Sequence, residues 1–139
     1  MHKGGKPIGY WLREADKSIS AMVNQKLEKY NVTRSHWQVL NTVYERDRIS
    51  KEDLLNLLSH FIDDSMLNEI ITHFIRQNWV IELNAPETLI SMTKEGKEVF
   101  HDIFSTQQKT RMQLFEGVSE EEYEITINVL KRIIENAKR

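Results

Sequence analysis

The feature that most constrains the fold is a change of hydrophobic period at Asn78. Before it, apolar side chains recur at helical steps of three and four in two short segments joined by residues 59–62. After it, two strand-like runs follow, Trp79–Leu83 and Leu89–Met92, with a turn at residues 84–87. Two short helices with a brief join are typical of a helix-turn-helix, and a hairpin directly behind it is a wing. The sequence therefore predicts a winged helix-turn-helix.

Both short helices carry signals for where they begin and end. Ser50 opens a Ser-x-x-acid capping box, and Asp63 can cap the second helix, which Asn78 can end in the left-handed conformation. Ahead of them, residues 45–48 read as a charged loop and Ile49 as a short pairing strand. The side chains expected to point inward from the second helix are Leu67, Ile70, Ile71, Phe74 and Ile75.

Long amphipathic segments flank this region on both sides. The first begins at Ile8 and Asn31 can end it, and Thr33 can cap the helix that follows. Thr93 can cap a second long helix, which Gly117 ends. A last helix, opened by a capping box at 119–122, carries an apolar stripe wider than one neighbour needs. We expect a mainly α fold with a small β-hairpin, as one domain over residues 1–139. Its lobe at 33–92 would be flanked by dimerisation helices at 8–30 and 94–137.

Composition narrows the function classes. The 139 residues contain no cysteine, which excludes a disulfide scaffold, a thiol switch and a Cys-ligated zinc site. No apolar run is long enough to span a membrane, and the start at 1–6 does not resemble a signal peptide, so we expect a cytoplasmic protein. The five histidines have no metal-ligand spacing, and no catalytic motif is present. We therefore expect no enzyme activity, cofactor or metal.

Four local patterns resemble the multiple-antibiotic-resistance regulator (MarR) family over residues 8–137. Trp37–Leu40 is similar to the aromatic-Gln-x-x-Leu core of that family's second helix. Phe74–Val80 is similar to its exit from the recognition helix, and Met92–Gly96 to its Leu-Thr-x-x-Gly entry into the long helix. Gly117–Glu122 is similar to its entry into the last helix. The four occur in order and at compatible spacing.

The resemblance implies a transcriptional regulator that is a homodimer, with one winged lobe on each half-site of a pseudo-palindromic double-stranded DNA. We expect a repressor that responds to a small molecule. The terminal helices support the dimer independently, because they carry more apolar surface than a monomer of this size can hide.

The second short helix is the expected DNA-reading element. Asn68 suits adenine, Met66 a thymine methyl group, and Glu69 the cytosine amino group. We expect phosphate contacts at Ser50 and Lys51, a backbone contact at Arg76, and base contacts at Ser65, Met66, Asn68, Glu69 and His73.

Two departures from the family pattern weaken this expectation. The wing, Trp79–Met92, holds no Lys or Arg and is shorter than usual, so a minor-groove arginine cannot be carried over. Residues 34–97 hold seven Lys and Arg against ten Asp and Glu, a net charge of −3. We therefore expect DNA affinity that is weak, salt-sensitive or absent. The alternative is a winged-helix protein-interaction module that has lost DNA binding.

An aromatic crevice is the expected effector site. Family members bind aromatic anions between the dimer helices and the winged lobe, and aromatic walls with a cation suit a phenolate or carboxylate. The candidate lining residues are Trp11, Arg13, His36, Trp37 and Tyr44. The competing interpretation makes Trp11 and Trp37 core anchors.

Overall fold

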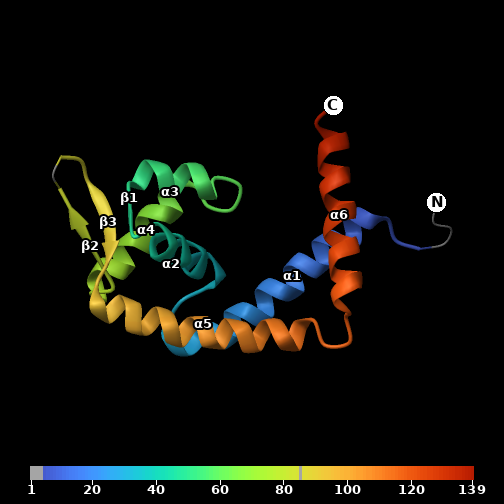
Figure 1. Ribbon diagram of the computed structural model, residues 1–139, viewed down its shortest axis with the longest axis horizontal. Helices are drawn as coiled ribbons and strands as arrows, with labels where there is room; N and C mark the ends of the chain where they lie inside the picture. Colours follow the sequence, from blue (N-terminus) through green and yellow to red (C-terminus); the bar gives the residue numbers. More distant parts are fainter. Residues whose placement is uncertain (1–4, 85) are drawn as a thin grey trace.

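The computed structural model describes residues 5–84 and 86–139, and Figure 1 shows the arrangement of their elements. The elements are, in chain order, α1 (Ile8–Leu27), the 3-10 turn η1 (Glu28–Tyr30), α2 (Arg34–Arg46), β1 (Arg48–Ile49), α3 (Lys51–Leu58), α4 (Asp64–Arg76), β2 (Val80–Leu83), β3 (Leu89–Met92), α5 (Lys94–Leu114) and α6 (Glu120–Ala137).

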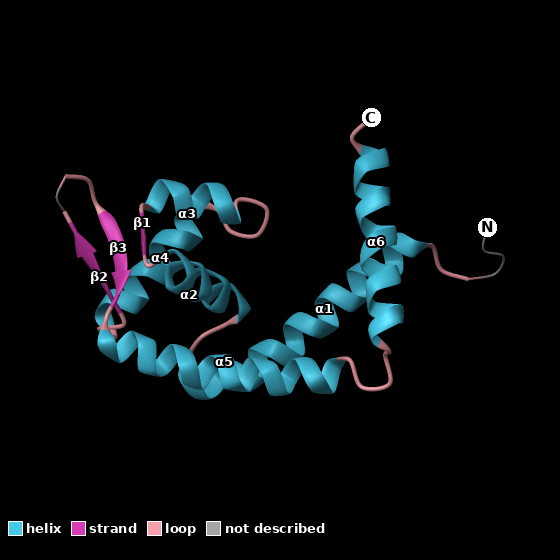
Figure 2. Cartoon of the chain, in the orientation of Figure 1, coloured by secondary structure: helices cyan, strands magenta, loops and turns pink. Residues whose placement is uncertain are grey.

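The long helix α5 forms the base of the molecule. Figure 1 shows the winged lobe, α2 to β3, at the N-terminal end of α5, and α6 rising from its C-terminal end. Helix α1 packs on α5, and the Tyr30 hydroxyl lies 3.0 Å from the hydroxyl of Thr106 on α5. The expected fold is confirmed: it is mainly helical, with a helix-turn-helix and a small antiparallel sheet (Figure 2).

The sheet has three strands in the order β1-β3-β2. Strand β3 is central, pairing Val80 with Met92 and Leu83 with Leu89 on one side, and Ile49 with Ile90 on the other. The expected pairing strand at Ile49 is therefore present, and it extends the hairpin to a third strand.

Side-chain and backbone caps set the helix ends where the sequence predicted them. The Asp63 carboxylate accepts the Met66 N–H at 2.8 Å, and Thr33 and Ser119 each take part in a reciprocal capping box. Asn31 and Asn78 are left-handed, with φ of 59° and 63°. The side chains of Asp63, Thr33 and Ser119 satisfy backbone N–H groups that the start of a helix leaves free, whereas Asn31 and Asn78 act through their backbone conformation.

One junction ties the end of α4 to the start of α5. The Thr93 hydroxyl donates to the Asn78 carbonyl at 2.6 Å, and the Thr93 N–H to the Trp79 carbonyl at 2.9 Å. A Cβ at Gly96 would lie 2.0 Å from that Trp79 carbonyl, so only glycine fits there. The Thr-x-x-Gly pattern thus fixes the angle between the winged lobe and the long helix.

The core lies inside the winged lobe and beneath it on α1 and α5. Its most deeply buried large side chains are Leu27, Leu40, Leu54, Leu67, Phe74 and Ile103. In contrast, α6 has no buried residue. None of the described helices is both long and apolar enough to cross a membrane.

Three local predictions were wrong in detail. Ile75 was expected to face inward but is 39% exposed, because it lies about 80° around the helix from Leu67. Glu45 and Arg46 belong to α2 and not to a loop, and Trp79 precedes the strand that begins at Val80. Ala85, in the predicted turn, lies outside the described residues.

Candidate nucleic-acid interface

Helix α4 presents one apolar face to the lobe and one polar face to solvent. Leu67, Ile70, Ile71 and Phe74 are buried and hold the helix against its neighbours. Its exposed residues include the five expected contacts Ser65, Met66, Asn68, Glu69 and Arg76. The packing fixes this outer face as a rigid surface, which is what reading a groove requires.

The sixth expected contact on α4, His73, lies differently. It is only partly exposed, and its ring packs edge-on against His36 of α2 and Trp79, with ring centroids 5.3 and 5.9 Å away. Its Nε2 atom is buried without a hydrogen-bond partner. His73 therefore turns toward α2, at the edge of the outer face.

His36 serves as a cap and as a neighbour of His73. Its Nδ1 accepts the Thr33 N–H at 3.2 Å, which places the lone pair of a neutral ring at this atom. Burial and then the nearby His73 lower the pKa of His36. Both rings line a hollow of about 470 Å³ whose wall includes Glu28.

The two expected phosphate contacts lie at the start of α3. The Ser50 hydroxyl accepts the Asp53 N–H at 3.0 Å, so it caps the helix and keeps its own proton to donate. The ammonium of Lys51 lies 3.8 Å from the carboxylate of Asp64 at the start of α4. That carboxylate also accepts a 3.3 Å hydrogen bond from the Asn68 amide. Asp64 thus contacts two residues expected to bind DNA.

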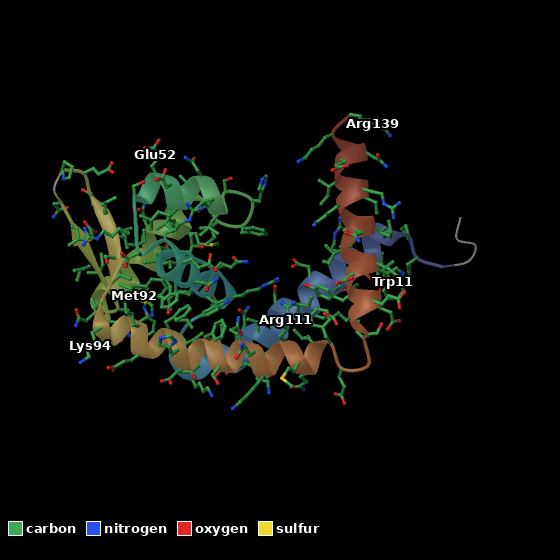
Figure 3. The ribbon with its side chains drawn as sticks, in the orientation of Figure 1. Trp11, Glu52, Met92, Lys94, Arg111 and Arg139 are labelled. Atoms are coloured by element: carbon green, nitrogen blue, oxygen red, sulfur yellow. The ribbon has the colours of Figure 1, made fainter. Side chains whose placement is uncertain are left out.

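The wing carries a different surface. Strands β2 and β3 contain no cation, and Ile81 on β2 is 43% exposed. Figure 3 shows that the cation Lys94 lies below the hairpin, at the start of α5. The structure thus gives the wing no charge with which to hold a phosphate.

The five residues expected at an effector crevice do not come together. Trp37 lines a groove of about 550 Å³ between α1, α2 and α5, whereas His36 lines the separate hollow beside His73. Tyr44 stacks on Phe100, with ring centroids 3.9 Å apart. Trp11 is 57% exposed on α1 (Figure 3), so it is not a core anchor, and Arg13 is exposed beside it.

The groove at Trp37 has polar groups that sequence reasoning missed. Gln107 places a buried Oε1 atom there without a hydrogen-bond partner. Arg34 lines it as well, while its guanidinium pairs with Asp16 at 3.1 Å. Two consecutive glutamines, Gln107 and Gln108, between the apolar positions of the long helix were the available signal.

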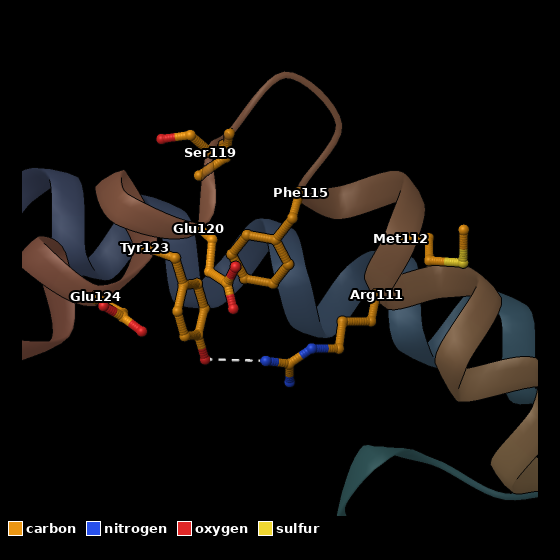
Figure 4. A pocket seen from close by; sticks show the side chains of 8 residues that line it. Arg111, Met112, Phe115, Ser119, Glu120, Tyr123 and Glu124 are labelled. Carbon is orange, nitrogen blue, oxygen red and sulfur yellow. Dashed lines mark hydrogen bonds between the residues drawn. The ribbon is translucent and has the colours of Figure 1, made fainter.

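The joint between α5 and α6 holds the main contacts of the last helix. Arg111 donates to the Tyr123 hydroxyl at 3.0 Å and lies over the rings of Phe115 and Tyr123 at 5.5 and 5.4 Å (Figure 4). Around this joint, Met112 is 76% and Val118 45% exposed. Large apolar side chains are also exposed along both terminal helices: Ile8, Tyr10, Trp11, Leu12, Ile125, Ile133 and Ile134.

No group of three or more possible metal ligands occurs among the residues that the structure describes.

A helix-turn-helix followed by a β-hairpin and set between long helices defines the winged-helix class. A mutant MarR of E. coli complexed with operator DNA is similar in structure: the TM-score is 0.81, with 19% sequence identity over 91% of this chain and 93% of that one. A putative MarR-like transcription regulator from Bacillus cereus also gives 0.81, at 16% identity over 93% and 94%. A probable transcriptional regulator from Pseudomonas aeruginosa gives 0.80, at 17% identity over 92% and 97%.

The chain therefore has the fold of MarR and MarR-like transcription regulators. The likeness lies in the fold, because no protein-family model and no curated protein matches the sequence.

Proposed function

We propose that this chain is a DNA-binding transcriptional regulator that acts as a homodimer and represses its target genes. The observation that carries the proposal is the rigid, polar outer face of α4 within a MarR fold. One protein of that fold was crystallised with operator DNA, at a TM-score of 0.81 to this chain. A regulator of this kind would act in the cytoplasm, where its DNA lies.

On DNA, the N-terminal half of α4 would enter the major groove. Asn68 would pair with adenine, Glu69 would accept from cytosine, and Met66 would touch a thymine methyl group. Ser50, Lys51 and Arg76 would bind the backbone and set the register. His73 would lie at the edge of the contact, since its ring packs on α2.

The net negative charge of the winged lobe lowers its expected affinity for DNA. Residues 34–97 carry a net charge of −3, and the wing adds no cation. Because phosphate neutralisation supplies most non-specific affinity, each lobe alone would bind weakly. Two lobes in one dimer would recover affinity through effective concentration.

The dimer would use α1, α5 and α6, at residues 8–30 and 94–137. Helix α6 buries no residue within its own chain, yet Ile125, Ile133 and Ile134 are 54%, 38% and 52% exposed. Apolar patches of this extent mark interaction surfaces. A second copy, related by a two-fold axis, would cover them and set the distance between the two α4 helices.

A small aromatic anion is the proposed effector, and the groove between α1, α2 and α5 is its proposed site. Trp37 and Phe104 supply aromatic walls, Arg111 supplies a cation for the anionic group, and the unpartnered Gln107 oxygen would accept from a hydroxyl of the ligand. This groove separates the winged lobe from the terminal helices, so a ligand there would shift one against the other. Quenching of Trp37 fluorescence by salicylate-like compounds, lost in Gln107→Leu, would support the site.

A protein partner is the second candidate. Leu57, Phe61 and Met66 are 45%, 63% and 40% exposed on α3, its join to α4 and the start of α4. Apolar side chains at these places suit a protein better than a phosphate backbone.

One experiment separates the two functions. The full-length chain is titrated on labelled duplex from the gene's own upstream region at low salt, beside Asn68→Ala and Arg76→Ala. If the chain binds DNA, Asn68→Ala removes a base contact, costs about 1–3 kcal/mol of binding free energy and relaxes sequence choice. Arg76→Ala removes a backbone contact and weakens binding to all sequences alike. If no duplex binds at low salt, the DNA function is wrong.

A further inference from the structure

The carboxylate of Asp64 bridges the starts of the two helices of the motif. It lies 3.8 Å from the Lys51 ammonium on α3 and accepts a 3.3 Å hydrogen bond from the Asn68 amide on α4. The Asp64 side chain is 66% exposed and that of Lys51 43% exposed. The Asp64 carboxylate is therefore an accessible negative charge at the surface where DNA would approach.

Asp64 is not the cap of its helix. The preceding residue, Asp63, accepts the Met66 N–H at 2.8 Å and satisfies the free backbone donor. The carboxylate of Asp64 can therefore be replaced without uncapping α4, and its contacts to Lys51 and Asn68 need another explanation.

The position suits an anion. The Lys51 ammonium lies beside the first turn of α4, where Asp64 stands, and both favour negative charge. A DNA phosphate would be attracted to the same place for the same reason. Asp64 and a phosphate would then compete for Lys51, and Asn68 could offer its full amide edge to adenine only after leaving Asp64.

We propose that Asp64 acts as an internal competitor for DNA, holding Lys51 and Asn68 until a phosphate and a base displace it. This rests on the proposed DNA-binding function and names the residue that lowers its affinity. Non-specific DNA offers the phosphate but not the matching base for Asn68. It therefore recovers less of the cost of breaking both contacts, and Asp64 raises the selectivity of binding.

The test compares full-length wild-type chain with Asp64→Asn, which removes the charge and keeps the shape. Glu45→Gln on the exposed face of α2 is the matched control, since it changes the net charge equally and lies outside the proposed dimer helices. Affinity for labelled upstream duplex and for a scrambled duplex is measured by fluorescence anisotropy over about 50–200 mM salt. Circular dichroism of each variant confirms that the fold is unchanged.

The expected result is that Asp64→Asn binds about tenfold more tightly, the equivalent of one exposed charge contact. Its salt dependence becomes steeper by about one phosphate contact for each lobe. The gain is larger on scrambled than on upstream duplex. In a Lys51→Met background the gain shrinks, because the ammonium is no longer there to be released.

Three results would overturn the proposal. If the wild type binds DNA and Asp64→Asn binds no better than Glu45→Gln, Asp64 is no competitor, although the DNA function stands. An equal gain with and without Lys51 would refute the route through Lys51. If neither wild type nor Asp64→Asn binds any duplex at low salt, the proposal fails together with the DNA function.

Discussion

Helices α4 and α6 are both amphipathic, yet only α4 buries its apolar face against other parts of the same chain. Helix α4 buries Leu67, Ile70, Ile71 and Phe74 against the lobe, whereas α6 buries nothing. The local signals are equally strong, since both helices have a side-chain cap at the first turn. Helix α4 is therefore fixed within its lobe, whereas α6 leaves an apolar stripe uncovered, which the proposed dimer would cover.

The largest effect is expected at Phe74. It is 1% exposed and packs against Trp79 and His36. Phe74→Ala should lower the free energy of unfolding by about 3–5 kcal/mol, because it leaves a cavity under α4. Urea denaturation followed by circular dichroism measures this. A loss near that of a surface substitution would mean that α4 is not fixed by the lobe.

A smaller effect on a different quantity is expected at Ile134. Ile134→Glu places a charge on the exposed apolar stripe of α6, and should weaken dimerisation by about 2 kcal/mol or more, ~30-fold. Sedimentation equilibrium measures the dissociation constant. Asn128→Glu, on a polar part of the same helix, is the control and should leave it unchanged. Equal behaviour of the two variants would argue against this interface.

The start of α6 offers the third test. Ser119 accepts the Glu122 N–H at 3.0 Å, and the Glu122 carboxylate accepts the Ser119 N–H at 2.9 Å. Ser119→Ala should cost about 1 kcal/mol of stability. These backbone and hydroxyl contacts lower the pKa of Glu122. The cap is therefore complete above the carboxyl's ordinary pKa and is lost as pH falls through the lowered value, which thermal melts at acid pH would detect.

The smallest effect is a pH dependence at the back of α4. The pKa of His36 is lowered from its ordinary 6.5, first by burial and then by His73. The unfolded chain therefore binds the proton more readily, so stability is lost as pH falls below about 6.5.

His36→Gln should reduce this acid sensitivity while keeping the cap, since Gln suits the third position of a capping box. Urea midpoints of both chains at neutral and mildly acid pH are the measurement. The same acid dependence in both chains would exclude His36 as its source.

Local sequence signals were enough to predict most of the fold. Thr33, Asp63 and Ser119 were found as caps, and Asn31 and Asn78 as left-handed ends, because each acts on the backbone beside it. The hydrophobic period placed the helix-turn-helix and the hairpin. Ile75 was misjudged because it lies at the margin of the buried stripe, where only the neighbouring elements decide exposure.

The candidate site was less predictable because its contacts join separate elements. Nothing near Lys51 in sequence indicates that Asp64, on the next helix, lies beside it. The turn of His73 toward His36 depends on the angle between α4 and α2. Trp11 and Trp37 were both candidates for the effector crevice, yet Trp11 is exposed on α1 and Trp37 lines the groove.

The central claim is that two copies of this chain, joined through their terminal helices, bind one DNA site. Sedimentation velocity of the full-length chain alone and with labelled upstream duplex tests it most directly. We expect a dimer without DNA and a complex of two chains for each duplex, both weakened in Ile134→Glu. A monomer that stays monomeric on the duplex, or a dimer that leaves the duplex free at low salt, would contradict it.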